Sequence, residues 1–549
     1  MSRRDPWRAV ALVLGAVLLS VIVLPQLRLL RAAFVDEAGA WTLANVTRFL
    51  GGVRYRQGLA NTALAGLVST ALALAIGVPI GFLYARFRLP YRTAVLTLAT
   101  LSTVSPPFLG AYVWMMLLGW SGPVARALRA AGLPFESIMG FHGIVWVTVW
   151  SSVGLVVLFA HDAFVGADPS LEEAALSVGA TRWRATLRIT LPLAAPGILT
   201  AAYLILMAVL TDFGTPKIIG GDVPMLPVLV YHDYLAEVSG NPSMAATASL
   251  AMLALSTLLL MLQRLFLARR STHVAGARRA TPRPLSRGRT FVATLATGIV
   301  LSLVFVPHLG VLALSFATWR ADVPGLPLTL ANYGALLRRS MAPVAVSYVL
   351  ALAATAVALT LGAVLAYVVV RRSYRLLSPA LSALVMTPFL IPGTVLAVGL
   401  IVAFNRPPLL LTGTPLILVL AYVIRKLPYA LKAAEAGLYQ VHPSLEEAAL
   451  SVGAGPTRAF RDVTARLILP SLVSGGALTF LMSITELSAT ILLYSAAWTT
   501  MSVVIFQAAL GLGGQFGLAA STAVVLIVSV YLPVYLVRRR FDVGAGLAA

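Results

Sequence analysis

Cysteine is absent from the 549 residues of this chain, so the sequence can form neither disulfide bonds nor thiolate metal sites. Charged residues are scarce, at 11%, whereas hydrophobic residues reach 59% and the mean hydropathy is +0.91. Soluble proteins average about 25% charged and about 45–50% apolar residues. This composition excludes a soluble enzyme, a disordered chain and a fibrous protein. Long apolar runs, in place of short alternating segments, favour an all-α polytopic membrane protein over a barrel.

Lysine is also scarce, since only three of the 41 basic residues are Lys. Lys217, Lys426 and Lys432 follow proline, arginine and leucine, so no glycine–lysine core of a P-loop exists. Paired-histidine metal motifs and a nucleophile elbow are missing too. We therefore expect no catalytic residue, no resident metal and no cofactor, and a chain that is not an enzyme. The net charge of +22 could suggest nucleic acid, but no soluble basic region could carry that function, and we expect no nucleic acid partner.

Twelve apolar runs are long enough to be transmembrane helices. They lie near 9–30, 59–85, 94–118, 141–160, 196–219, 244–267, 291–316, 343–370, 378–403, 411–424, 467–493 and 516–537. With a cytoplasmic N-terminus, 28 of the 41 basic residues fall in inside segments and 12 in outside segments, whereas the acidic residues divide 10 to 8. A bias confined to Lys and Arg follows the positive-inside rule, so we expect both termini in the cytoplasm. We also expect the first run to be retained as a helix, because no clear cleavage site follows it.

An internal repeat divides the chain. Residues 268–290 form a polar, basic, proline-containing linker between units 1–267 and 291–549. The segment DPSLEEAALSVGA at 168–180 returns as HPSLEEAALSVGA at 442–454, with twelve of thirteen positions identical at an offset of 274. Ser105-Pro-Pro-Phe108 resembles Met386-Thr-Pro-Phe389 at an offset of 281, which implies an insertion in the first unit. We predict two six-helix units in tandem, with the substrate path between them.

The repeated segment falls in an inside loop of each unit. Its Pro-Ser start is typical of the beginning of a helix, and we expect Ser170 and Ser444 to cap the free amides. Small and apolar residues then recur at helical spacing on one face: Leu171, Ala174, Ala175 and Val178. One interpretation is an amphipathic helix that lies on the bilayer or closes a loop of its own domain. The other is a docking surface for a partner with two like sites, because the copies are near-identical while the flanking helices have diverged.

The residues of this segment resemble a known motif. Glu173-Ala174-Ala175-x-x-x-Gly179, followed by Ile189-x-Leu191-Pro192, is similar to the EAA loop of inner-membrane permeases of binding-protein-dependent ABC importers. The second copy keeps Glu447-Ala448-Ala449-x-x-x-Gly453 but has Ala465-Arg466 where Leu-Pro is usual, which puts its exit geometry in question. The resemblance implies coupling loops at 168–192 and 442–466. Their ATPase-coupling residues would be Glu172, Glu173, Ala174, Ala175, Gly179, Glu446, Glu447, Ala448, Ala449 and Gly453.

The resemblance also implies an activity and partners. A multi-pass permease of the bacterial cell inner membrane would move a small solute by alternating access. A separate cytoplasmic ATPase, expected to be a homodimer, would drive it, and a periplasmic binding protein would deliver the solute. The fused architecture and the stretches 210–216 and 485–491 resemble ferric-iron-type permeases, which makes ferric iron the leading substrate. Alternatives are 2-aminoethylphosphonate, thiamine, a polyamine or, in another class, a secondary transporter driven by an ion gradient.

Two acidic residues fall at equivalent places in apolar runs of the two units. Asp212 and Glu486 each follow a threonine at the repeat offset of 274. Intramembrane acids are costly and mark candidate path residues, so they could attract a cation or form a gate. The alternative is structural: a hydrogen bond to a neighbouring helix, or a cap at a helix break near Gly214. Both interpretations stay open at this point.

Other polar and proline residues give weaker indications. The run 231–234, Tyr-His-Asp-Tyr, lies in an outside loop and could suit a hard metal ion. Four adjacent residues cannot all converge on one ion from a regular element, so a docking surface for the binding protein is favoured over metal ligation. Pro106, Pro107, Pro388 and Pro392 interrupt apolar runs and predict broken or kinked helices.

Overall fold

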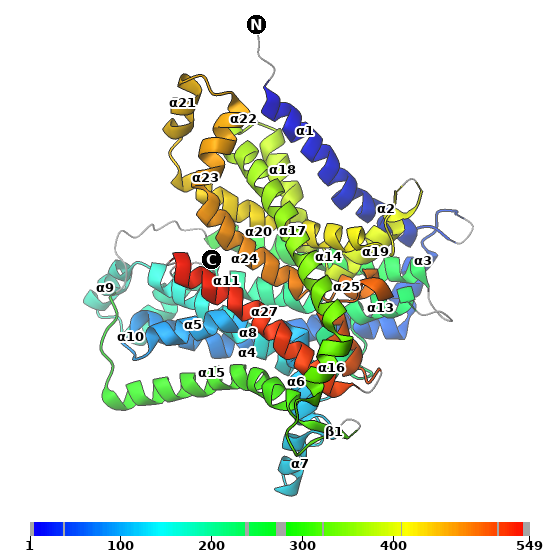
Figure 1. The fold of residues 1–549 in the computed structure, drawn as a ribbon. Helices are drawn as coiled ribbons and strands as arrows, with labels where there is room; N and C mark the ends of the chain where they lie inside the picture. The colour runs from blue at the N-terminus through cyan, green and yellow to red at the C-terminus, as the bar shows by residue number, and fades with distance from the viewer. Residues whose placement is uncertain are drawn as a thin grey trace.

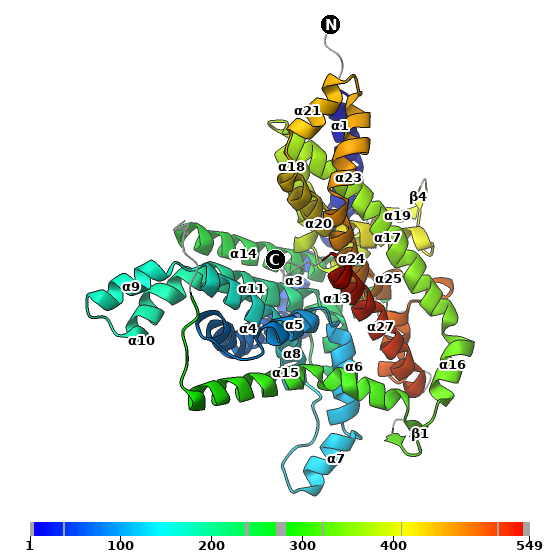
Figure 2. The same ribbon diagram turned by 60° about the vertical axis from the view of Figure 1, so that its left-hand side comes forward.

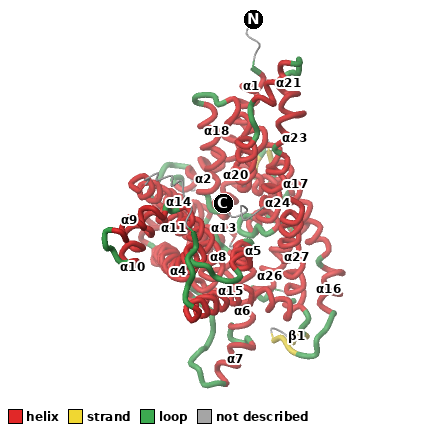
Figure 3. Tube along the Cα trace, turned by 90° about the vertical axis from the view of Figure 1, so that its left-hand side faces the viewer, coloured by secondary structure: helices red, strands yellow, loops and turns green. Residues whose placement is uncertain are grey.

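The computed structural model of the chain describes residues 5–36, 39–235, 241–270, 281–320, 323–407, 409–512 and 515–541. Its helices gather into two arms, one formed mainly by the first half of the chain and one mainly by the second (Figure 1). Strands within the described residues are confined to two short antiparallel hairpins (Figure 3). The predicted all-α architecture is confirmed.

The first half contains fourteen α-helices, numbered α1 to α14, and two π-helical turns. In chain order they are α1 (Pro6–Leu18), η1 (Leu19–Val23), α2 (Leu24–Ala33), α3 (Ala44–Gly51), α4 (Val53–Arg86), α5 (Arg92–Thr103), α6 (Pro107–Leu118), α7 (Pro123–Ala130), α8 (Phe141–Gly166), α9 (Pro169–Ser177), α10 (Arg182–Ala185), η2 (Thr186–Thr190), α11 (Leu191–Thr211), α12 (Gly214–Ile219), α13 (Leu226–Leu235) and α14 (Pro242–Arg270).

The second half repeats this order with small differences. Its elements are α15 (Arg287–Ser315), β1 (Thr318–Arg320), β2 (Val323–Gly325), α16 (Ala331–Arg339), α17 (Met341–Tyr367), η3 (Val368–Arg372), α18 (Leu377–Met386), η4 (Thr387–Leu390), α19 (Gly393–Phe404), β3 (Asn405–Arg406), β4 (Leu409–Leu410), α20 (Pro415–Gln440), α21 (Ser444–Ser451), α22 (Pro456–Ala459), η5 (Phe460–Thr464), α23 (Ala465–Leu467), α24 (Leu469–Ile484), α25 (Thr490–Leu493), η6 (Ala496–Trp498), α26 (Met501–Ala509) and α27 (Phe516–Phe541).

Matching helix lengths locate the insertion predicted from the repeat. Helices α8 and α20 both have 26 residues and begin 274 residues apart. Helices α6 and α19 both have 12 residues but begin 286 residues apart. The extra residues of the first half lie between α6 and α8 and include α7, where the second half has only the β3–β4 hairpin. The structure therefore pairs Pro106 with Pro392, and the sequence alignment at an offset of 281 is wrong for this break.

Prolines break one span in each half, as the sequence predicted. Helix α5 ends at Thr103, and α6 begins at Pro107 after the Ser-Pro pair. In the second half, Pro392 precedes α19, which is bent by 111° from the segment Leu377–Leu390. Proline lacks an amide hydrogen and clashes with the preceding turn, so it cannot continue a straight helix. Each break leaves a new helix start inside the bundle.

The first helix of each half packs against the other half. Helices α1 and α2 lie against α18 and α19, and α15 lies against α5 and α6. Within their own halves, α2 also packs against α14 and α15 against α27. Figures 1 and 2 both show α15 running along the arm that holds α4, α5 and α8. Near the junction, the buried rings of Phe213 and Phe506 lie 5.4 Å apart, so a continuous apolar core joins the halves.

The count of membrane-spanning helices is close to the predicted twelve. Among the described residues, nine helices are long and apolar enough to cross a bilayer, or eleven if two bent pairs are counted as spans. Helix α20 is long enough as well, with 26 residues, but carries Arg425, Lys426 and Lys432. The helix continues beyond the predicted apolar run 411–424, to Gln440. Part of the predicted linker 268–290 lies outside the described residues.

Candidate functional site

The two copies of the repeated segment form helical hairpins at separate tips of the molecule. Helices α9 and α10 end one arm, while α21 and α22 end the other (Figures 1 and 2). Gly179 and Gly453 lie between the paired helices with φ of +89° and +90°. Glycine adopts this left-handed backbone without strain, which explains the predicted turn. Both turns are therefore built in the same way.

Helices α9 and α21 begin differently, because Asp168 in the first copy is replaced by His442 in the second. In the first copy, an Asp168 side-chain oxygen accepts a hydrogen bond from the Ser170 amide at 2.9 Å. In the second copy, the Nδ1 atom of His442 lies 2.8 Å from the Ser444 hydroxyl. Ser170 and Ser444 were expected to be the caps, and this expectation is wrong. An aspartate two residues before the serine already caps the first helix.

Glu172 ties the first loop to the body of its arm. Its carboxylate accepts a hydrogen bond from the Thr190 hydroxyl at 3.1 Å and lies 3.7 Å from the Arg86 guanidinium. Arg283, from the stretch before α15, donates to the other carboxylate oxygen at 3.2 Å. The same stretch is held in place by backbone hydrogen bonds, in which the Arg283 amide donates to the Arg86 carbonyl. Three segments far apart in the sequence thus converge on one buried carboxylate.

Glu446 repeats this anchor in the second loop. It accepts a hydrogen bond from Thr464 at 3.2 Å and lies 3.6 Å from Arg372. The Tyr367 hydroxyl donates to the same carboxylate. Thr190 and Thr464 are each the last residue of a π-helical turn, η2 and η5. Such turns widen a helix locally and often lie at functional sites. The glutamate–threonine–arginine arrangement is therefore common to both arms.

Other predicted loop residues face outward. Glu173, Glu447, Ala174 and Ala448 are exposed, and Ala175 and Ala449 are half-buried. Val178 and Val452 are 85% and 86% exposed, although valine normally prefers to be buried. The sequence alone did not separate the two adjacent glutamates of each copy. In the structure, the first points into the arm and the second lies on the surface.

The exits of the two loops differ where the sequence departed from the motif. In the first copy, α11 begins at Leu191 and 182–211 is a single candidate span. In the second, the segment Pro456–Leu467 and helix α24 are bent by 70°. The Leu-Pro step is displaced to Leu469-Pro470, where α24 begins. The substitution by Ala465-Arg466 thus coincides with a bent exit.

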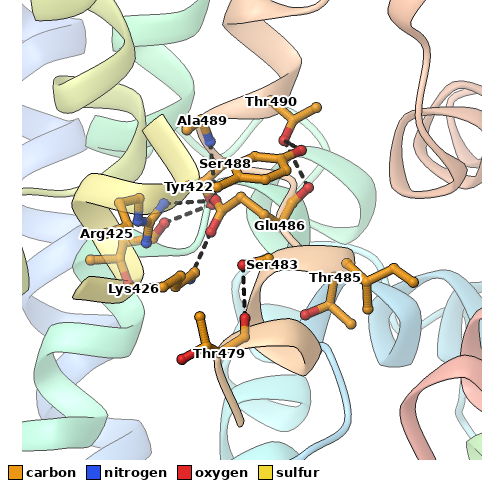
Figure 4. A network of polar contacts seen from close by, with 12 residues as sticks. Tyr422, Arg425, Lys426, Thr479, Ser483, Thr485, Glu486, Ser488, Ala489 and Thr490 are labelled. Carbon is orange, nitrogen blue, oxygen red and sulfur yellow. Dashed lines mark hydrogen bonds and ion pairs between the residues drawn. The ribbon is translucent and has the colours of Figure 1, made fainter. Parts of the chain in front are cut away.

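The acid predicted at Glu486 lies in a buried polar cluster (Figure 4). Arg425 Nη1 donates to one carboxylate oxygen at 2.7 Å, and Lys426 Nζ donates to the other at 2.9 Å. The Ala489 amide also donates to Glu486, at 3.2 Å. The carboxylate is therefore neutralised by two neighbouring cations on α20 and also binds the backbone amide that precedes the short helix α25.

Asp212 occupies the equivalent place in the first half with different partners. Its Oδ1 atom accepts a hydrogen bond from the Thr215 amide at 3.1 Å and so caps α12. The Ser488 hydroxyl donates to the carbonyl of Thr211 at 3.0 Å, which joins the two acid-bearing segments across the junction of the halves. The structure thus brings the segments of Asp212 and Glu486 together. Whether either acid belongs to a translocation path stays a prediction.

The run 231–234 lies in α13 and is only partly exposed, so the prediction that it forms a loop is wrong, while its side of the membrane stays a prediction. Asp233 is buried and accepts a hydrogen bond from the Tyr55 hydroxyl at 2.9 Å. Burial raises the pKa of Asp233, and the hydrogen bond from Tyr55 acts in the opposite direction. Among the described residues, no three His, Asp or Glu side chains are grouped to hold a metal ion. The Asp233 carboxylate has an interior structural contact instead.

Sequence reasoning missed Arg425, Lys426, Arg86, Arg372 and the two π-turn threonines. Arg425 and Lys426 directly follow the apolar run 411–424, and the positive-inside pattern places such residues in a cytoplasmic loop. A signal was nevertheless present, because α20 continues with a helical apolar pattern beyond them. The threonines carry no local signal, since their role depends on a glutamate 18 residues earlier.

Comparison with known proteins supports this architecture. The family model described as "binding-protein-dependent transport system inner membrane component" matches residues 77–272 and 358–543. A ferric transport system permease protein of Actinobacillus pleuropneumoniae is 28% identical over 92% of this chain and 74% of its own length. A probable ABC transporter permease of Sinorhizobium fredii is 27% identical over 98% of this chain and 96% of its own length. A putative 2-aminoethylphosphonate transport system permease of Salmonella paratyphi A is 35% identical, over 23% of this chain and 48% of its own length.

Proposed function

The chain belongs to the family of binding-protein-dependent transport system inner membrane components, as a fused ABC importer permease that resembles ferric-type permeases, and we propose that it imports ferric iron. It is a multi-pass protein of the inner membrane. The proposed cycle is alternating access, in which the two arms rock about their junction. ATP hydrolysis takes place in a separate subunit, and both termini lie in the cytoplasm.

The observation that carries the coupling proposal is the duplicated loop, in which the first glutamate is anchored to the arm and the second is exposed. Buried Glu172 and half-buried Glu446 connect each loop to its arm through hydrogen bonds and ion pairs. Exposed Val178 and Val452 present apolar surface at each tip, where a partner could cover it. A homodimeric ATPase offers two identical clefts for these two tips. Movement of either cleft would then reach the transmembrane helices through the anchored glutamate.

The substrate proposal is supported by the relatives. Two permeases named for ferric transport match 92% and 78% of this chain, at 28% and 29% identity. The phosphonate permeases match at 35% identity but over 23% of the chain. Ferric iron is therefore the first substrate to test and 2-aminoethylphosphonate the second. A periplasmic binding protein would hand the solute to the face that bears α3, α7 and α16.

Uptake of radiolabelled ferric iron by iron-starved cells tests both parts of this proposal. A strain without the chain is compared with strains that re-express the intact chain, the Glu173→Ala/Glu447→Ala variant, or the control Asp222→Ala. Asp222 is exposed and far in sequence from both loops. We expect uptake to be restored by the intact chain and by the control, and lost in the double variant.

Two results would count against the proposal in different ways. Equal iron uptake in all strains, with no second iron system active, would remove ferric iron and make phosphonate uptake the next assay. Full uptake by the double variant would contradict coupling through these loops. Co-purification of an ATPase that depends on the same two glutamates distinguishes an ABC importer from a secondary transporter, which would bind none.

A further inference from the structure

The cluster around Glu486 has an excess of positive charge. Arg425 and Lys426 both pair with Glu486, and within the described part of the chain neither has a second carboxylate partner. The Lys426 side chain is 8% exposed and the Glu486 side chain 5%. An uncompensated charge is costly inside a membrane protein unless a partner or water reaches it. Among the described residues, one positive charge of this cluster therefore lacks an anion.

Arg425 has hydrogen-bond donors to spare. A guanidinium has five N–H groups on three nitrogens. Only Nη1 has an acceptor among the described residues, and that acceptor is Glu486. The side chain is 15% exposed, more than that of Lys426 or Glu486. Planar guanidinium groups bind carboxylates, phosphates and phosphonates through paired hydrogen bonds.

The start of α19 adds further donors at the same place. A Cβ atom built on Gly393 would lie 1.9 Å from Arg425 Nη1, so the guanidinium lies directly against the first turn of this helix. The helix starts at the Pro392 break without a side-chain cap, and its first residues are buried. Thr394, in the same turn, is fully buried, and its hydroxyl has no partner among the described residues. Uncapped amides at a helix start favour an anion.

The first half lacks this charge. Helices α8 and α20 correspond residue by residue, and Ser151 and Ser152 stand where α20 has Arg425 and Lys426. The scaffold of the repeat therefore does not require the two cations. Ser488 also lies beside Gly393 and donates to the Thr211 carbonyl, which places the cluster at the junction of the two halves. In transporters built from repeats, solutes bind at this junction, often at broken-helix starts.

We propose that Arg425, Lys426 and the first turn of α19 bind a small oxyanion at the junction of the halves, an inference that rests on the proposed transport function. The anion is either a phosphonate that is itself the solute or an anionic ligand that travels with ferric iron. Glu486 holds the two cations apart and orients them. It is not a site for a bare cation, because both of its oxygens are already occupied by positive groups.

Thermal unfolding of the purified full-length chain in lipid nanodiscs tests this site. Orthophosphate, 2-aminoethylphosphonate, ferric citrate and citrate alone are titrated separately at constant ionic strength. A ligand that binds only the folded state raises Tm in a saturable way, from which Kd follows. We expect saturable binding by the intact chain. Arg425→Gln should raise Kd about 10- to 100-fold, the range that follows from loss of a hydrogen bond to a charged group.

Two matched variants separate binding from folding. Glu486→Gln increases the positive charge of the cluster and should keep or tighten anion binding, whereas a cation site would be lost. Arg375→Gln removes an exposed arginine outside the cluster and should bind as the intact chain does. If Arg425→Gln does not fold, Lys426→Gln and Gly393→Ala make the same test. A purely structural ion pair would change the Tm of the unliganded variants and leave no ligand-dependent shift in any of them.

The outcomes identify the source of the anion. Binding of 2-aminoethylphosphonate without ferric citrate would indicate a phosphonate solute, and ferric citrate binding tighter than citrate alone would indicate an iron complex. Absence of a shift with all four ligands, or unchanged Kd in Arg425→Gln, would overturn the site. Failure of the anion site and failure of the transport proposal give different results. The anion site is tested by ligand-dependent shifts of Tm, whereas the transport proposal is tested by uptake and ATPase co-purification with the Glu173→Ala/Glu447→Ala variant.

Discussion

Replacement of Glu172 by glutamine should loosen the first coupling loop without unfolding the chain. The hydrogen bond from Thr190 to the charged carboxylate is worth about 1.5–3 kcal/mol. The ion pair between Glu172 and Arg86 is long, at 3.7 Å, but both side chains are only 10% exposed. Breaking a buried ion pair typically costs about 3–5 kcal/mol, and we expect the loss of this long pair to contribute part of that cost. Arg283 is 37% exposed, and its pair adds no more than about 1 kcal/mol.

Glutamine can still accept one hydrogen bond, which recovers part of this energy. We therefore expect the local opening of the loop to become easier by about 3 kcal/mol, which corresponds to about 100-fold faster amide exchange. Hydrogen–deuterium exchange of the purified chain in nanodiscs, followed on peptides that cover α9, α10 and η2, measures this directly. Peptides of the second loop serve as an internal reference.

Glu173→Gln is the matched control, because it makes the same chemical change one residue later on the exposed face of the same helix. Its exchange rates should stay within a fewfold of those of the intact chain. Equal exchange of the first loop in both variants would refute the assignment of Glu172 as the anchor. Faster exchange spread over all helices of Glu172→Gln would instead mean a global loss of stability.

Three further predictions concern single contacts. Gly393→Ala should displace the Arg425 guanidinium, because the new methyl group would lie 1.9 Å from it. We expect Tm in a thermal scan to fall by several degrees. An unchanged Tm would show that the arginine moves without loss of stability. Gly453 has a φ of +90°, at which alanine is strained, so Gly453→Ala should cost about 1 kcal/mol of local stability. Amide exchange around α21 should become faster. Exchange equal to that of the intact chain would contradict the proposed backbone strain. Ser488→Ala should remove the hydrogen bond to the Thr211 carbonyl and lower the free energy of unfolding, measured by chemical denaturation, by about 1 kcal/mol. An unchanged free energy would mean that apolar packing alone holds the two halves together.

The sequence predicted what depends on local pattern. Long apolar runs gave the spans, Pro106 and Pro392 gave the broken helices, and the duplicated segment gave two helical hairpins with a glycine turn. These features are encoded by residues close together in the chain. Hydropathy, proline chemistry and the conformational freedom of glycine act over a few residues, so single-sequence reasoning can find them.

What the sequence did not reveal depends on partners that are distant in the chain. Arg425 looked like the first residue of a basic loop, because its neutralising carboxylate is 61 residues away. The different roles of Glu172 and Glu173 are likewise set by Arg86, at the end of α4, and Arg283, from the stretch before α15. Pattern reasoning places charges outside apolar runs, and a buried ion pair is the case in which that rule fails.

The exchange of first helices between the arms makes the two halves of this chain mutually dependent. A cut between residues 270 and 281 would give two fragments, each with an apolar helix that packs partly against the other fragment. Each fragment would expose the face of this helix that packs against the other fragment, so we expect each to be less stable alone and the two to reassemble as an interlocked pair. A gene split at this point would therefore encode an obligate heterodimer, whose subunits must be made in equal amounts. Joining them in one chain fixes that ratio and excludes pairs of identical halves.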